Sequence, residues 1–134
     1  MIFMEKKYTV KEICESWQKI VIDDGDEILR TTEYLSYQNK MAVCEDIIQQ
    51  SMFVNKRYRP NSPYFNLLFA MKLVDIYTCI KIDYENIFEE YDLLVVGHLL
   101  DYLLTNVIPV NEQERFQDLL EMQLGDFNER RNAK

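Results

Sequence analysis

Apolar side chains recur every three to four residues along much of this chain, which is the period of one face of an α-helix. The first such segment covers about residues 10–22 and includes Ile13 and Trp17. Thr9 precedes it and Glu12 follows three residues later, which is the capping-box pattern of a helix start. The pattern therefore predicts a first helix, and the acidic DDGDE stretch that follows is expected to end it as a turn.

Further helices are predicted by the same period. They cover about residues 37–53, 63–80, 84–90, 93–107 and 112–124. Their predicted N-terminal caps are Ser36, Ser62 (followed by Pro63), Asp83, Asp92 and Asn111. The predicted buried stripe of the second helix is Met41, Cys44, Ile47, Ile48 and Met52. Pro109 and Gly125 are expected to end the last two helices, and the β-branched content of residues 28–35 suits a short extended piece.

The predicted helix 63–80 is apolar almost all round, which is typical of a helix surrounded by protein. We therefore predict an all-α fold, a bundle of about five to six helices around this central helix. The whole chain, 1–134, is expected to form a single helical domain. Its ends are expected to be a short flexible N-terminus (1–8) and a polar C-terminal tail (125–134).

Composition agrees with one globular domain of 134 residues, since 48% of the residues are hydrophobic and 28% are charged. The longest apolar stretch, 64–82, is interrupted by Lys72, Asp75 and Lys81, so a core helix is expected rather than a membrane span. Met1 to Lys7 is too short and too charged for a signal peptide. Three widely spaced cysteines argue against a disulfide scaffold, and each is expected to be a buried thiol. The expected location is the host cytoplasm or a virion.

Charge is distributed unevenly along the chain, whose formal net charge is -8. Residues 1–82 carry 11 acidic and 11 basic side chains, whereas residues 83–128 carry 11 acidic side chains and one base, Arg115. The last six residues carry one acid and three bases. Such an asymmetry points to a charged partner, and it makes a generally basic nucleic-acid binder improbable.

Signatures of catalysis are missing from the sequence. His98 is the only histidine, and Asp101 lies three residues on, but no nucleophile is indicated beside the pair. One histidine and three scattered cysteines do not supply a zinc site, and no glycine-rich phosphate loop or other common catalytic motif occurs. We therefore expect no catalytic residues, no cofactor and no metal, and a protein that is not an enzyme.

Two charged clusters are the candidate partner-binding residues. The basic cluster consists of Lys56, Arg57, Tyr58 and Arg59, and the acidic cluster consists of Glu89, Glu90 and Asp92. The basic cluster suits a docking loop for an acidic protein surface, while its tyrosine would also suit nucleic acid. Either cluster can equally be a solvated surface.

Three segments of the sequence resemble small helical proteins that phages and prophages of Gram-positive bacteria encode. These segments are NSPYF, LLFAMKLVDIYTCIKID and EEYDLL. The similarity covers about residues 36–124. It implies a helical, phage-encoded accessory or structural protein, and it transfers no functional residues.

Taken together, these features favour a non-enzymatic protein–protein interaction module, a virion-associated or assembly protein of a phage. The abundance of aromatic residues, nine of them tyrosine, and the segregated charge support it, and head-to-tail homo-oligomers that weaken with salt are a corollary. One alternative is an acidic inhibitor that mimics nucleic acid and blocks a host DNA-binding enzyme. A lesser alternative is a small DNA-binding regulator, because the YTVKEI segment is similar to the opening helix of helix-turn-helix domains.

Overall fold

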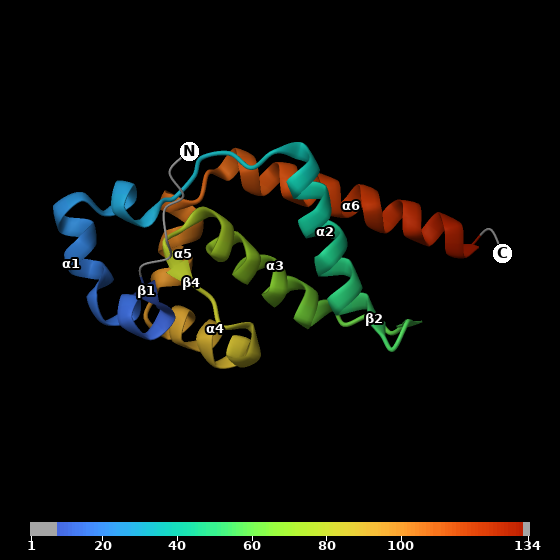
Figure 1. The fold of residues 1–134 in the computed structure, drawn as a ribbon, viewed down its shortest axis with the longest axis horizontal. Coiled ribbons are helices and arrows are strands. Elements are labelled where there is room, and N and C mark those ends of the chain that lie inside the picture. Colours follow the sequence, from blue (N-terminus) through green and yellow to red (C-terminus); the bar gives the residue numbers. More distant parts are fainter. Residues whose placement is uncertain (1–7, 133–134) are drawn as a thin grey trace. The chain divides into compact units, whose positions relative to one another are not determined.

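The computed structural model describes residues 8–132, except the side chains of residues 20–28 and 127–132. The described chain is mainly helical (Figure 1), which confirms the predicted all-α class. The helices are α1 (Val10–Leu29), α2 (Tyr37–Met52), α3 (Ser62–Tyr77), α4 (Ile87–Val96), α5 (Leu99–Tyr102) and α6 (Val110–Asn132). A 3-10 turn covers Tyr84–Asn86 and a π turn covers Leu103–Val107. The strands are β1 (Tyr8–Thr9), β2 (Phe53–Val54), β3 (Arg57–Tyr58) and β4 (Ile80–Lys81).

Contacts group the described residues into two compact units, each assembled from two separate stretches of chain. The first unit contains the described residues up to Glu33, together with Ala70–Val110. The second contains Tyr34–Phe69 and the described residues from Asn111 onward. The division falls inside α3, so this helix supplies residues to both units. The predicted flexible N-terminus lies outside the described residues, apart from Tyr8 in β1.

The first unit is organised around α1, which packs on α4 and β4. Its start follows the prediction, because the Glu12 backbone N–H donates to Thr9 Oγ1 at 3.2 Å. Ile13 is fully buried, and the indole Nε1–H of Trp17 donates to the Gly97 carbonyl at 3.2 Å. The predicted apolar stripe at this end of the helix is therefore confirmed.

The predicted turn after residue 22 is wrong, because α1 continues through the DDGDE stretch to Leu29. A glycine inside a helix costs only about 1 kcal/mol relative to alanine, which tertiary contacts can offset. Such contacts exist where the helix ends. Leu29 is fully buried and its carbonyl accepts from the Cys79 N–H at 2.9 Å.

The extended piece predicted for residues 28–35 is confirmed only where it meets α3. Arg30 forms a β-bridge with Thr78, and the Thr31 N–H donates to the Tyr77 carbonyl at 2.9 Å. The Arg30 side chain also donates from Nε to the Val107 carbonyl at 2.7 Å. It thereby satisfies a carbonyl at the end of the π turn, where the regular helical ladder is interrupted.

The predicted helix boundary at Asp92 is wrong, since Asp92 lies inside α4. The interruption comes at Gly97 and His98 instead, and His98 takes the left-handed conformation with φ 60°. Asp83 is a cap as predicted, but of the 3-10 turn that precedes α4; its carboxylate accepts from the Glu85 N–H at 3.1 Å. Of the two acidic caps predicted in this region, Asp83 and Asp92, only Asp83 caps a helical segment.

The second unit contains α2, the β2–β3 hairpin, the first half of α3, and α6. Ser36 caps α2 as predicted, since its Oγ accepts from the Asn39 N–H at 3.3 Å. The cap of α3 is Asn61 rather than Ser62, because the Asn61 side chain accepts from the Tyr64 N–H at 3.1 Å. α3 therefore begins one residue earlier than predicted.

Helix α6 is longer than predicted at both ends. It begins at Val110, and it passes through Gly125 to Asn132, so Gly125 does not end it. The tail predicted for residues 125–134 is thus helical as far as Asn132, and the last two residues lie outside the described chain.

Helix α3 contributes buried residues to each of the two units. From Leu67 to Tyr77 every residue of this helix is buried or partly buried, as expected for a helix that is apolar almost all round. In the second unit the Phe69 and Phe116 rings lie with centroids 6.2 Å apart. Cys44 and Cys79 are fully buried, whereas Cys14 is partly exposed. No helix among the described residues is both long and apolar enough to cross a membrane.

Candidate functional site

A buried ion pair lies at the centre of the second unit. Lys40 on α2 is 2% exposed and Glu112 on α6 is 1% exposed. The Lys40 Nζ donates to Glu112 Oε2 at 2.8 Å and to the Leu35 carbonyl at 2.9 Å. Desolvating two charges is costly unless their geometry and hydrogen bonds compensate, and here both groups are multiply bonded. The pair therefore holds the start of α2 rigidly against α6.

Glu112 also organises the residues around this pair. Its Oε1 accepts from the Leu35 backbone N–H at 2.8 Å, and its Oε2 accepts from Arg115 Nη1 at 3.0 Å. The Lys40 ammonium lies 4.4 Å from the centroid of the Tyr34 ring, which is a cation–π contact. One buried carboxylate thus positions the segment before α2, an arginine of α6 and, through Lys40, an aromatic ring.

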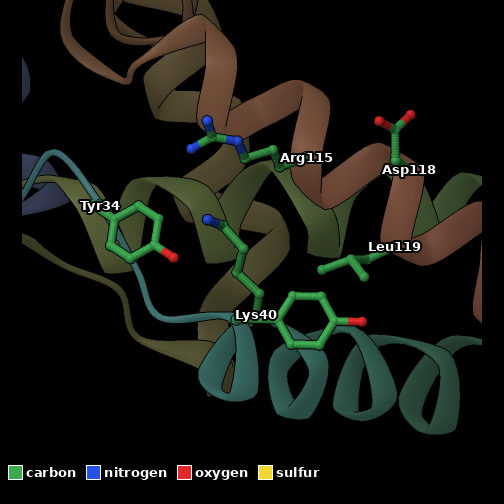
Figure 2. A pocket seen from close by; sticks show the side chains of 6 residues that line it. Tyr34, Lys40, Arg115, Asp118 and Leu119 are labelled. Carbon is green, nitrogen blue, oxygen red and sulfur yellow. The ribbon is translucent and has the colours of Figure 1, made fainter.

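A pocket opens directly beside the ion pair. Its volume is about 410 Å³, and it is lined by Tyr34, Tyr37, Lys40, Arg115, Asp118 and Leu119, the set that we name the α2–α6 pocket. Figure 2 shows the Lys40 and Arg115 nitrogen atoms on the Tyr34 side of the pocket, while the Asp118 carboxylate is directed away from Lys40. Tyr34 and Tyr37 are each 57% exposed, whereas Leu119 is buried. The pocket therefore combines aromatic walls, an apolar floor and one accessible guanidinium.

The chemistry of this pocket favours binding. The Lys40 Nζ is held in position by a carboxylate, a carbonyl and a ring. Arg115 has a single ion-pair partner among the described residues, Glu112, and its side chain is 58% exposed, which leaves donors that can face a ligand. Tyrosine and arginine are the residue types that most often anchor a protein partner.

The predicted basic residues lie together at one end of the second unit. β2 and β3 are two-residue strands that form an antiparallel hairpin, in which Phe53 pairs with Tyr58 and Val54 with Arg57. Lys56 is in the turn with φ 68° and Asn55 precedes it with φ 51°, which is the backbone that a type I′ hairpin turn requires. The exposed basic side chains of this hairpin are Lys56, Arg57 and Arg59, and Tyr58 is partly buried. We name residues 53–59 the basic hairpin.

The predicted acidic residues lie on α4 in the first unit, but they do not act as one group. Glu89 and Asp92 are exposed, whereas Glu90 is partly buried and its carboxylate accepts from the Asp83 N–H. Burial raises the pKa of Glu90, the hydrogen bond from the Asp83 N–H lowers it, and the Asp83 charge raises it, with a net increase. Glu90 is therefore part of a local cap, and only Glu89 and Asp92 are presented to solvent.

None of the residues of the α2–α6 pocket was singled out by the sequence. The predicted stripe of α2 included Met41, but Met41 is 36% exposed and its neighbour Lys40 is buried instead. A lysine at the position four residues before Cys44, on the buried side of the helix, is the signal that could have revealed the site. Glu112 gave no such signal because it lies in the first turn of a helix, where acidic residues are common.

His98, the one histidine, does not lie in the middle of a helix as the sequence suggested. It is exposed, it precedes α5, and it lines neither the α2–α6 pocket nor the pocket of about 450 Å³ beside β4 and the 3-10 turn. Asp101 is exposed as well. Among the side chains that the structure describes, no group of three or more from His, Cys, Asp or Glu is placed to hold a metal ion.

Comparison with known proteins identified no relative of this chain. The chain matches no protein-family model, no curated protein and no solved structure.

Proposed function

We propose that the protein is a non-enzymatic protein–protein interaction module that receives a side chain of its partner in the α2–α6 pocket. The observation that carries the proposal is the pair of tyrosines, each 57% exposed, beside the guanidinium of Arg115. Such aromatic and arginine anchors contribute most of the binding energy at protein interfaces. The buried ion pair beneath them supplies rigidity, which lowers the entropy lost on binding.

The partner chemistry follows from the lining residues. Leu119 and the tyrosine rings suit an apolar or aromatic side chain, and Arg115 suits an adjacent carboxylate or carbonyl group. The absence of a histidine, serine or cysteine from this lining supports binding over catalysis. A short peptide segment with an aromatic anchor is therefore the expected occupant.

The test selects short peptides from a random displayed library on the purified protein, and measures their affinity for the Tyr37→Ser variant. We expect a loss of about 30-fold, because an anchoring tyrosine contributes roughly 2 kcal/mol. Tyr84→Ser is the matched control, since Tyr84 is an exposed tyrosine of the other unit, and it should change affinity less than twofold. Selected peptides that bind Tyr37→Ser as tightly as the parent protein would contradict the proposal.

The biological setting that we propose is a phage, as a virion-associated or assembly protein. The support is the resemblance of residues 36–124 to small phage and prophage proteins. Mass spectrometry of purified particles from a lysogen that carries the gene should detect the protein in stoichiometric amounts. Its presence in the lysate without particles would favour a role in the host cell.

Nucleic-acid mimicry remains the second candidate because α6 presents an acidic stripe. Glu114, Asp118 and Glu121 are exposed at spacings of four and three residues, which places them on one side of the helix. Glu112 does not contribute, since it is buried and paired with Lys40. A mimic should displace duplex DNA from a basic DNA-binding protein, and Glu114→Gln with Glu121→Gln should weaken the displacement severalfold. Failure to displace DNA at low salt would exclude this function.

A further inference from the structure

Helix α4 presents several apolar side chains to solvent. Val96 is 76% exposed, Phe88 is 61% exposed and Val95 is 44% exposed, whereas Ile87 and Leu94 are buried. Single exposed apolar residues are ordinary, but several on one short helix mark an interaction surface. We name the residues Phe88, Glu89, Asp92, Val95 and Val96 the α4 face.

Charge on the α4 face has one sign. Glu89 and Asp92 are exposed among the apolar residues, and neither forms an ion pair with another described side chain. No lysine or arginine occurs from Ile82 to Glu114. A complementary surface must therefore offer apolar contact together with positive charge.

The basic hairpin of the same chain has this composition. Val54 is 57% exposed next to the turn and pairs with Arg57 across the hairpin, and Lys56 and Arg59 are exposed nearby in sequence. These three cations form no ion pair with another described side chain. No acidic residue occurs from Ile47 to Val74, so the positive charge of the hairpin is not offset nearby in sequence.

Both surfaces are held in place before any contact forms. Phe53 and Tyr58 pack edge to face across the hairpin with ring centroids 5.8 Å apart, and the Arg59 N–H donates to the Met52 carbonyl at 2.7 Å. α4 is anchored through Ile87 and Leu94 in the core of its unit. Preorganised surfaces lose less entropy on association than mobile ones.

We infer that this chain self-associates head to tail, with the basic hairpin of one copy docked on the α4 face of the next. The two surfaces differ, so the contact is heterologous and each copy keeps one hairpin and one α4 face for further neighbours. The inference needs only the geometry within each unit. It involves neither Tyr37 nor any other residue of the α2–α6 pocket, so its failure leaves the proposed function untouched.

The first measurement is sedimentation velocity of the full chain across a range of concentrations. We expect a weight-average mass that rises above 16.1 kDa with concentration at low salt and falls back at high salt, because exposed charges are screened. The contact of one hairpin with one helix is small, so association in the micromolar range is expected. A monomer at every concentration and salt level would overturn the inference.

Charge exchange identifies the surfaces. One variant carries Glu89→Lys and Asp92→Lys, and the other carries Lys56→Glu and Arg57→Glu. Each variant alone should remain monomeric at low salt, because its hairpin and its α4 face then have the same charge sign. An equimolar mixture should associate again, since each hairpin meets an oppositely charged α4 face on the other variant. A mixture that stays monomeric while both variants are folded by circular dichroism would overturn the inference.

Matched controls separate the named surfaces from net charge. The control for the hairpin variant carries Lys11→Glu and Lys19→Glu, which change the net charge by the same amount at exposed residues of α1. The control for the α4 variant carries Glu114→Lys and Glu121→Lys, which change the net charge by the same amount at exposed residues of α6. Both controls should retain most of the low-salt association. Equal loss in a control and in its matched variant would show that association depends on net charge instead of these two surfaces.

Discussion

At the scale of single residues, the main feature of this chain is the buried Lys40–Glu112 ion pair in the second unit. Lys40 occupies a position on the buried side of α2 that an apolar residue would ordinarily fill, and it forms an ion pair with Glu112 of α6. A buried pair of this kind need not stabilise a fold more than apolar residues would, but removal of one partner leaves the other uncompensated. The pair therefore constrains how α2 and α6 can pack.

We predict that Lys40→Met and Glu112→Gln each lower the free energy of unfolding by about 3 kcal/mol, measured by urea denaturation. In the double variant the glutamine carbonyl can still accept from the Leu35 N–H, and no buried charge is left unpaired, since Arg115, the other partner of Glu112, is 58% exposed. It should therefore be no less stable than either single variant, which corresponds to a coupling of about 3 kcal/mol. Lys11→Met, on the exposed side of α1, is the control and should change stability by less than about 0.5 kcal/mol. Additive single effects would refute the coupling.

Glu90 leads to a prediction about pH. Its pKa is raised above the ordinary 4.5, chiefly by burial, so the folded state binds more protons than the unfolded state just above that value. Stability contributed by this group is therefore present at low pH and is lost as the pH rises through the folded pKa. Glu90→Gln should leave stability unchanged well below pH 4.5 and increase it at neutral pH, in thermal unfolding monitored by circular dichroism. An increase that is equal at both pH values would count against this assignment.

At the scale of elements, helix length is the feature that tertiary contacts changed most. α1 and α6 both continue through a glycine that the sequence marks as an end. Helix propensity is a weak preference of about 1 kcal/mol per glycine, which the burial of one apolar side chain beyond the glycine can outweigh. Leu29 has this role in α1, since it is fully buried four residues after Gly25.

For α6 the cost of the glycine can be measured directly. Apart from the adjacent backbone of α6 itself, a Cβ added at Gly125 would meet no atom within 4 Å, so Gly125→Ala should stabilise the helix by about 0.5–1 kcal/mol. Gly97→Ala is the contrasting variant, because its Cβ would lie 3.2 Å from the Leu93 carbonyl oxygen. Chemical denaturation should show opposite signs for the two variants. A destabilising Gly125→Ala would mean that α6 does not continue through this residue in solution.

At the scale of the whole molecule, the two units cannot be assigned to two halves of the sequence. The chain passes from one unit to the other after Glu33, after Phe69 and after Val110. The second of these passages lies within α3, a helix whose hydrogen bonds continue across the division. We therefore expect the two units to unfold as one cooperative system.

Trp17, the single tryptophan, permits a test because it lies in the first unit. Phe116→Ala removes a fully buried ring from the second unit and should cost about 3–5 kcal/mol. If α3 couples the units, the fluorescence transition of Trp17 and the far-ultraviolet circular dichroism transition should shift together to lower urea concentration. The exposed Phe88→Ala change should shift neither transition by comparable amounts. A biphasic dichroism curve with an unmoved fluorescence midpoint would show independent units.

Local patterns were sufficient for the fold class and for several helix starts. The Thr9 and Ser36 caps and the buried Ile13 follow from side chains that hydrogen-bond or pack within one turn of their own position. The exposure of Lys56, Arg57 and Arg59 also follows, because these residues are charged and lie between helices. Each of these predictions depends only on interactions between residues a few positions apart in the sequence.

The α2–α6 pocket could not be predicted in this way. Lys40 and Glu112 are 72 positions apart in sequence, and each is unremarkable beside its own neighbours. The amino-acid sequence by itself determined that the chain is all-α, where α2 begins, and that charge is segregated between its regions. Only the tertiary structure decided which acidic residue is buried, where α1 ends, and that two exposed tyrosines line a pocket, because these outcomes depend on contacts between distant segments whose energies exceed local preferences.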